Sequence, residues 1–237
     1  MGLRRAYKNY RYRKMNQQEF FGLDIRFSGH QYSPAIRELI YHGLYEAHEI
    51  KGLQAVIHPT DKVLELGTGL GIITSLSARQ AKNGHVLSFE ANPDLIEDAR
   101  NLVRLNGISN VEIRHGVLVK DPTEAEQTFH LAKSFAESSL RPMSHAVSTI
   151  TVPTHDLVAV QADFQPDVLI CDIEGAEADL LPQVDLATIR AAVIELHPHV
   201  LSAGEVAGIY DHFIANQLYP KIEHCGGTVV VFERLEP

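Results

Sequence analysis

Short apolar runs alternate along the chain with segments in which apolar residues return every three or four positions. This pattern predicts strands at residues 62–66, 85–90, 111–114, 167–172 and 191–195, and helices at 34–50, 72–80, 93–105 and 204–218. Ser33-Pro34 and Asn92-Pro93 each offer an N-cap followed by a proline in the first helical turn. Strands that alternate with helices predict an α/β fold built on an open, mostly parallel sheet.

Two segments break this rhythm. Residues 118–165 contain strand-like runs at 129–131 and 147–152, separated by a polar stretch, and predict an insertion above the carboxyl edge of the sheet, where loops often carry substrate contacts. Residues 221–224 and 228–232 flank Cys225-Gly226-Gly227 and predict a closing antiparallel hairpin. Residues 31–237 are therefore interpreted as one domain, preceded by an arm at residues 1–30.

Composition and charge narrow the class of protein. The chain has 237 residues, of which 45% are hydrophobic, and only two cysteines. No apolar stretch approaches the roughly 18 residues that span a bilayer, and no signal peptide is recognisable, so a cytoplasmic protein without a membrane span is expected. The formal net charge of -9 is uneven, because residues 1–14 carry six basic residues and no acid. This basic arm predicts an RNA contact, a membrane-surface tether, or a tail that is mobile or docks on an acidic body.

A glycine loop follows the first predicted strand of the domain. Gly67, Gly69 and Gly71 allow a tight turn and a close backbone approach to a ligand, and Thr68 lies between them. Glu90 ends the next strand 19 residues after Gly71, where a carboxylate can accept both ribose hydroxyls of an adenosine. Because Ile72 stands where a dinucleotide fingerprint has its third glycine, the loop favours S-adenosylmethionine over NAD. Glu65, just before the loop, is expected to bind the ammonium group of that cofactor, directly or through water.

A second acidic segment follows the most apolar strand. Asp172 and Glu174 come at its carboxyl end, and Gly175 turns the chain into a helix. Methyl transfer from a sulfonium to a hydroxyl needs in-line alignment and a base for the hydroxyl proton, so either carboxylate is a candidate base. The alternative for Glu174 and Glu177 is that they only favour the positive start of the following helix.

Histidines follow the fifth predicted strand of this sheet. Glu195 ends this strand, and His197 and His199 follow it at every second position. His197 is expected to contact the substrate or act as a second base. With Asp172 and Glu174 nearby, the two histidines could instead bind a divalent metal. Chance supplies such pairs in a chain with 13 histidines, so no metal is assigned.

The residues resemble the FkbM-type methyltransferases, a branch of the class I enzymes that use S-adenosylmethionine. The resemblance covers about residues 41–234, and its most distinctive motif is the stretch from Asp172 to Glu177. It implies a Rossmann-like, seven-stranded sheet with an antiparallel last strand and helices on both faces, and O-methylation of sugars, natural products or similar acceptors. The site residues it implies lie near the methionine end of the cofactor, in the loop, at the ribose and beside the adenine: Glu46, Gly67, Gly69, Glu90, Ala91, Asn92, Gly116 and Val117.

These observations predict an O-methyltransferase that acts on a hydroxyl of a small molecule or glycan. An RNA methyltransferase that uses the basic arm is one alternative, but the acidic remainder, with 15 basic against 30 acidic residues, argues against extensive phosphate contacts. A cofactor-binding interaction subunit without activity is the other. The acceptor and the oligomeric state, including a homodimer, are left open by the sequence.

Overall fold

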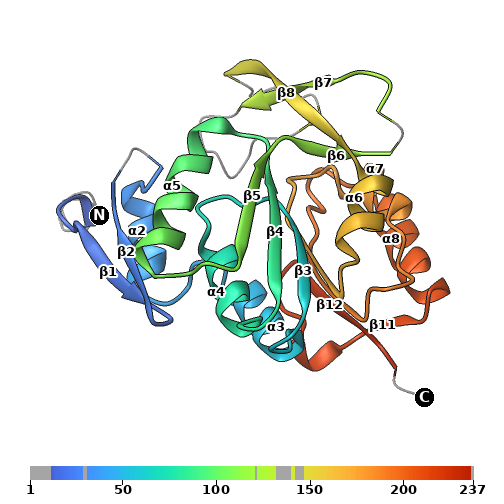
Figure 1. Cartoon of the computed structure of the whole chain (residues 1–237), viewed down its shortest axis with the longest axis horizontal. Helices are drawn as coiled ribbons and strands as arrows, with labels where there is room; N and C mark the ends of the chain where they lie inside the picture. The colour runs from blue at the N-terminus through green and yellow to red at the C-terminus, as the bar shows by residue number, and fades with distance from the viewer. Residues whose placement is uncertain (1–11, 29–30, 121, 132–139, 142–146, 236–237) are drawn as a thin grey trace.

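The computed structural model describes residues 12–28, 31–120, 122–131, 140–141 and 147–235. A seven-stranded sheet forms its centre, in the order β11-β12-β10-β9-β3-β4-β5 (Figure 1). The strands are β3 (Lys62–Leu66), β4 (His85–Glu90), β5 (Val111–His115), β9 (Val168–Cys171), β10 (Ala191–Glu195), β11 (Leu218–Pro220) and β12 (Val229–Arg234). β12 is antiparallel to β10 and β11, whereas β10, β9, β3, β4 and β5 are parallel. The predicted α/β fold with an antiparallel last strand is therefore confirmed.

Alternating side chains of the strands divide the core between the two faces of the sheet. Val63, Val168 and Val193 belong to one cluster of buried residues, while Leu64 and Leu169 belong to the other. The first face is covered by α2 (Pro34–Tyr41), α3 (Ala47–Val56), α4 (Ile72–Gln80) and α5 (Pro93–Leu105). The second is covered by α6 (Leu157–Phe164), α7 (Glu177–Leu180), the 3₁₀ helix η2 (Leu181–Gln183) and α8 (Ala203–Ala215). Strands buried on both faces are apolar throughout, as β9 is.

Some local predictions are wrong in detail. The helix expected at 204–218 ends at Ala215, and Leu218 begins β11. The single helix expected at 34–50 is two helices, because Gly43 and Glu46 adopt left-handed backbone conformations with φ of 71° and 46°. Residues 222–224 form the 3₁₀ helix η3 (Ile222–His224) instead of a strand, and the antiparallel partner of β12 is β11, a few residues earlier. At the predicted turn, Gly226 and Val229 form an isolated antiparallel bridge.

The N-terminal segment is part of the core as far as it is described. β1 (Gln17–Phe20) and β2 (Leu23–Arg26) form an antiparallel hairpin, and the side chains of Phe20, Leu23 and Ile25 are buried in the first cluster. Upstream of it, the buried Tyr12 hydroxyl lies 3.1 Å from His42 Nε2. Of the arm expected at residues 1–30, the described part at 12–28 docks on the domain, which is one of the alternatives expected for it, while residues 1–11 lie outside the described residues.

The insertion forms a small sheet of its own above the carboxyl edge (Figure 1). β8 (Ser148–Asp156) pairs with β6 (Val117–Val119) in parallel and with β7 (Glu126–Leu131) antiparallel. The insertion predicted at 118–165 includes residues 157–164, but these form α6, which packs on the second face of the main sheet through Leu157 and Val160. In the described part of the chain, no helix combines the length and apolar character required to cross a membrane.

Candidate active site

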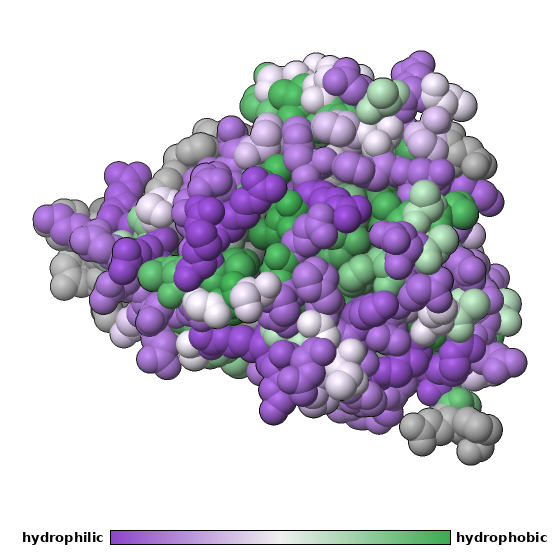
Figure 2. Space-filling view, viewed as in Figure 1, coloured by the Kyte–Doolittle hydropathy of each residue, from purple (hydrophilic) through white to green (hydrophobic). Residues whose placement is uncertain are grey.

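A cavity of about 770 Å³ lies between the carboxyl edge of the main sheet and the insertion. Its wall is built from the residues that follow β3, β4, β5, β9 and β10, together with β6 and β7 of the insertion and the start of α3. This edge is where open α/β sheets bind ligands. On the face drawn in Figure 2, apolar residues are visible in a central hollow that hydrophilic residues surround.

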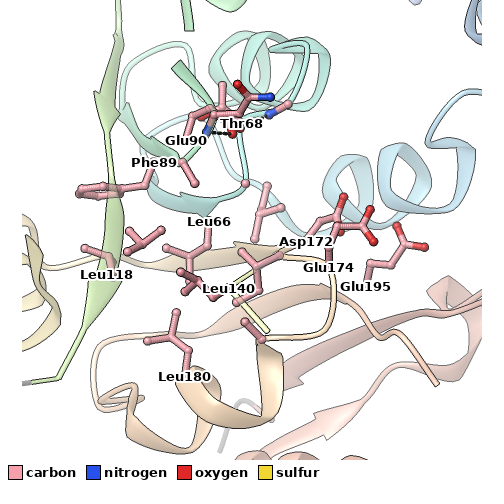
Figure 3. A pocket seen from close by; sticks show the side chains of 18 of the residues that line it. Leu66, Thr68, Phe89, Glu90, Leu118, Leu140, Asp172, Glu174, Leu180 and Glu195 are labelled. Carbon is pink, nitrogen blue, oxygen red and sulfur yellow. Dashed lines mark hydrogen bonds between the residues drawn. The ribbon is translucent and has the colours of Figure 1, made fainter. Parts of the chain in front are cut away.

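Most of the residues singled out from the sequence lie on this wall. They are Glu46, Gly67, Thr68, Gly69, Glu90, Ala91, Asn92, Gly116, Val117, Asp172, Glu174 and His197. Glu65 and Gly71 do not line the cavity, nor does His199, the other histidine considered as a metal ligand. In Figure 3, Thr68 and Glu90 lie on one side of the cavity and Asp172, Glu174 and Glu195 on another.

The glycines of the loop serve different purposes. A Cβ on Gly67 would lie 1.8 Å from the carbonyl oxygen of Asp172, so the absence of a side chain allows the loops after β3 and β9 to touch. A Cβ on Gly69 would meet no atom within 4 Å, although its φ of 53° is left-handed. Only Gly69 therefore has open space beside its backbone, whereas Gly67 is required for packing within the protein.

Glu90 is held at the carboxyl end of β4 by backbone donors. Its Oε2 accepts a hydrogen bond of 2.8 Å from the Gly69 N–H, and its Oε1 accepts one of 2.7 Å from the Asn92 N–H. Burial raises the pKa of Glu90 to about 7, and these backbone hydrogen bonds act in the opposite direction. The carboxylate is thus fixed in place and faces the cavity, as a group that binds paired hydroxyls must be.

Glu65 faces the interior and not the cavity. It is fully buried; its Oε2 accepts a 2.6 Å hydrogen bond from the Thr74 hydroxyl, and its Oε1 makes none. Burial raises the pKa of Glu65 to about 8, against the lowering effect of hydrogen bonds from Ser88 and Thr74. The geometry therefore does not support the direct ammonium contact expected of Glu65, because β3 directs this side chain toward α4.

His197 links three carboxylates on the other side of the cavity. Its Nδ1 lies 2.7 Å from Oε1 of the fully buried Glu177, and its Nε2 lies 3.2 Å from Glu174 Oε2 and 3.6 Å from Asp172 Oδ1. Burial by itself lowers the pKa of His197, but the hydrogen bond and charge of Glu177, aided by Glu174 and Asp172, outweigh it and raise the pKa to about 9. A pKa of about 9 favours the imidazolium at neutral pH, and the expected role of His197 as a substrate contact or second base stays a prediction.

The carboxylates near His197 are correspondingly basic. Burial raises the pKa of Glu174 to about 7; His197 opposes this shift, and Glu195 adds to it. Burial also raises the pKa of Asp172, with Glu174 as the next cause. The Oδ1 of Asp172 is buried and makes no hydrogen bond. A carboxylate with a pKa near neutrality, as Glu174 has, suits proton abstraction from a hydroxyl, and the unpaired Oδ1 leaves Asp172 as the other candidate base.

A group of further acids continues this side of the cavity. Glu46, Glu49 and Glu195 bring carboxylate oxygens within 4.8 Å of one another. The potential ligand atoms of Asp172, Glu177 and His197 lie within the same distance of one another. Burial raises the pKa of both Glu46 and Glu49. So many acids at close range favour a cationic ligand, which an ammonium and a sulfonium would satisfy and a metal ion also could.

Several residues on or behind the cavity wall had no functional assignment from the sequence. Glu49 lies one helical turn after Glu46, which is the signal that could have indicated it. Glu177 was interpreted as a helix-start residue, yet it is the partner that orients His197. The insertion contributes Leu118, Gln127 and other residues to the lining, and no local sequence pattern predicts that they reach the cavity.

Known proteins match parts of this chain. A ribosomal protein L11 methyltransferase from Bacillus subtilis is 31% identical over 107 residues, which cover 45% of this chain and 34% of that protein. Protein-L-isoaspartate O-methyltransferase 1 from a Polaromonas species is 42% identical over 60 residues, a quarter of each chain. The matches thus span only about a quarter to a third of the length of these relatives.

Solved structures resemble the chain more broadly but more weakly. The cofactor-bound Rv0187 from MTB has a TM-score of 0.48 and 14% identity, covering 81% of both chains. An O-methyltransferase from Bacillus cereus, in complex with SAH, has a TM-score of 0.46 and 13% identity, covering 79% of this chain and 80% of its own. Such weak likeness says nothing of the acceptor.

The family is established by a match of another kind. The model of the methyltransferase FkbM domain matches residues 67–226, which is more than half of the chain. The matched range runs from the glycine loop through Glu90 and the Asp172–Glu177 segment to the turn before β12. The chain therefore belongs to the FkbM family of S-adenosylmethionine-dependent methyltransferases.

Proposed function

We propose that this chain transfers the methyl group of S-adenosylmethionine to a hydroxyl group of a small molecule or glycan. The observation that carries the proposal is the pair of carboxylates, Asp172 and Glu174, beside the imidazolium of His197 and in the same cavity as Glu90 and the glycine loop. A binding site for the donor and a candidate base for the acceptor thus share one space.

The residues present fit the cofactor. Glu90 would hold the ribose hydroxyls, the backbone near Gly69 would approach the nucleoside, and Gly116-Val117 would lie beside the adenine. The acids Glu46 and Glu49 offer negative charge to the methionine ammonium, and burial raises the pKa of each, as expected for carboxylates that await a cation. When bound, the cofactor supplies a methyl group activated by a sulfonium.

The chain's own contribution is alignment and proton removal. The oxygen of the acceptor hydroxyl forms a bond to the methyl carbon while Asp172 or Glu174 accepts the hydroxyl proton. The carbon–sulfur bond breaks, and its electron pair stays on sulfur. His197 stays protonated, and Glu177 holds its Nδ1 so that Nε2 faces both carboxylates. One carboxylate remains charged beside the imidazolium while the other takes the proton.

Two measurements test this proposal. Calorimetry should detect S-adenosylmethionine binding to the full chain, and absence of binding would overturn the catalytic function. In a screen of cell extracts with labelled cofactor, Asp172→Asn and Glu174→Gln should keep cofactor affinity within about tenfold yet reduce transfer at least about a hundredfold, as loss of a general base does. Asp163→Asn, at an exposed site on α6, is the matched control and should behave as the unmodified chain.

The outcomes also separate the alternatives. Normal transfer by both variants would show that the base is wrongly assigned, and cofactor binding without transfer to any acceptor would favour a non-catalytic interaction subunit. Labelling confined to the RNA fraction would favour an RNA methyltransferase. The buried position of Tyr12 removes one tyrosine of the basic arm from RNA stacking.

A further inference from the structure

The cavity has a third side, which is apolar and separate from the Glu90 side and the acidic side. Leu66 at the end of β3, Leu118 on β6, Leu140 after β7 and Leu180 on α7 all lie on it. In Figure 3, Leu118 and Leu180 lie farthest from Asp172 and Glu174, and Leu66 and Leu140 lie between them. We call Leu66, Leu118, Leu140 and Leu180 the leucine wall.

The leucine wall is assembled from both halves of the structure. Leu66 and Leu118 are almost fully buried in the core cluster of the second face, and Leu180 packs on that same cluster while only partly buried. Leu140 is likewise partly buried and packs against Phe129 and Val152 of the insertion. Leu140 and Leu180 therefore keep apolar surface that a ligand in the cavity can cover.

The positive charge of Arg141, next to the leucine wall, is already paired with carboxylates. The Arg141 guanidinium donates hydrogen bonds of 2.9 and 3.1 Å to Asp179 and of 2.7 Å to Glu205. These contacts hold the insertion against α7 and α8, and they leave the arginine engaged by two carboxylates. Lys120 lies on the cavity wall as well, but it is exposed to solvent. Among the described residues of the acceptor side, the buried cation is His197, which Glu177, Glu174 and Asp172 already surround, so it is not available to a phosphate or carboxylate of the acceptor.

This lining discriminates between acceptors. Every sugar hydroxyl placed on the leucine wall would lose its water without a hydrogen-bond partner, at a cost of about 1–3 kcal/mol each. An apolar group there gains about 25 cal/mol for each Å² that it removes from water. The amide side chains of the lining are Asn92, which caps α5, Gln127 and Gln183. Asp179, next to Leu180, is already paired with Arg141, so the wall offers few partners to the several hydroxyls of a sugar ring.

We propose that the acceptor is an apolar alcohol or phenol, whose hydrocarbon part lies on the leucine wall while its hydroxyl reaches Asp172 and Glu174. This inference rests on the proposed function and narrows it: of the small molecules and glycans that a hydroxyl methyltransferase could serve, the cavity selects an apolar small molecule. The insertion, which supplies Leu118 and Leu140, is then the element that selects it.

Direct binding tests the inference without knowledge of the natural acceptor. The full chain is saturated with S-adenosylhomocysteine, and calorimetry then measures the affinity for naphthol and for methyl glucoside. Naphthol is expected to bind at least about tenfold more tightly, since tenfold corresponds to only about 1.4 kcal/mol. Failure of naphthol to bind, or equal or tighter binding of the glucoside, would overturn the inference.

Variants locate the binding. Leu140→Asn and Leu180→Asn keep side-chain size but place an amide on the wall, and each should weaken naphthol binding at least about tenfold while S-adenosylhomocysteine affinity changes less than about twofold. Leu235→Asn, 69% exposed and far from the cavity wall, is the matched control and should leave both affinities unchanged. Unaltered naphthol binding in both wall variants would place the acceptor elsewhere.

The proposed function fails in a different way from this inference. Absence of S-adenosylhomocysteine binding would remove the methyltransferase function, whatever naphthol does. Binding of S-adenosylhomocysteine with preference for methyl glucoside would leave methyl transfer intact and refute only the apolar acceptor.

Discussion

Glu177→Gln should move the alkaline limit of the methyl-transfer reaction. The substitution removes the charge that lies 2.7 Å from His197 Nδ1 but keeps an amide oxygen that can accept the same hydrogen bond. The His197 pKa is raised to about 9 mainly by this hydrogen bond and charge, against the lowering effect of burial. In the unmodified chain, the imidazolium therefore persists until about pH 9.

The size of the shift follows from the charge that is lost. Two opposite charges about 4 Å apart interact by about 4 kcal/mol at an effective dielectric constant near 20, or about 3 pKa units. Glu174 and Asp172 still face Nε2, and Glu46 and Glu195 lie on the same side of the cavity, so part of the raised pKa remains. A fall of about 2 units, from about 9 to about 7, is expected for His197.

The assay is the pH dependence of kcat/KM, measured with labelled cofactor and any accepted hydroxyl compound. The carboxylate of Glu174, with a pKa of about 7, must lose its proton to act as a base, so the rate rises through pH 7; the loss of the imidazolium lowers it near pH 9. These limits belong to the coupled cluster as a whole. In Glu177→Gln the two limits converge near pH 7, and the maximum falls by at least about threefold because less enzyme holds both required protonation states.

An independent measurement and a control complete the test. Nitrogen NMR of the histidine rings, with His197 assigned by a His197→Asn variant, should show the same fall in pKa without any acceptor. Glu112→Gln removes an exposed carboxylate from β5, at the far edge of the sheet, and should leave both limits in place. An alkaline limit that stays near pH 9 in Glu177→Gln, with an unchanged His197 titration, would refute the assigned role of Glu177.

Three further variants probe other parts of the site. Glu90→Gln should weaken S-adenosylmethionine binding at least about tenfold in calorimetry, since hydrogen bonds to a charged group contribute about 1.5–3 kcal/mol; unchanged affinity would remove Glu90 from the site. Gly67→Ala should lower the free energy of unfolding by more than about 3 kcal/mol, because its Cβ would overlap the Asp172 carbonyl. Gly69→Ala should lower it by only about 1–2 kcal/mol, the strain of a left-handed backbone at alanine. Equal losses in denaturant unfolding would contradict this. Burial raises the folded-state pKa of Glu65 to about 8, so the stability it contributes is fully present only below its unfolded pKa and is lost as pH rises toward 8. Glu65→Gln should therefore gain about 2 kcal/mol relative to the unmodified chain between pH 5 and pH 7 in urea unfolding, and a constant difference would contradict the raised pKa.

Local pattern alone determined the regular elements of the main sheet. The strands at 62–66, 85–90 and 191–195 and the helix at 72–80 have the bounds that their apolar period and flanking turn residues predicted. The FkbM motifs also indicated the family, and the position of their acids after strand ends placed Glu90, Asp172 and Glu174 at one edge. These features could be predicted because each depends on residues that are neighbours in sequence.

Only the tertiary structure decided which side chains meet across long separations. Glu177 and His197 are 20 residues apart, and they meet because β9 and β10, which precede them, are parallel neighbours in the sheet. The same holds for Gly67, whose missing side chain is required by the carbonyl of Asp172 and not by a ligand, and for Glu65, which β3 directs away from the cavity. Sequence period fixes the face of an element, but the partner of that face follows from strand order and register.

The glycine loop could be recognised from the sequence, whereas the leucine wall could not. Gly67 to Gly71 form a contiguous motif whose spacing indicates the donor, so the sequence sufficed for the cofactor. The leucine wall has four members drawn from β3, β6, α7 and the loop after β7, and nothing in their spacing connects them. Burial of apolar surface is not directional, so leucines carry no sequence signal of the cavity they line until the fold brings them together.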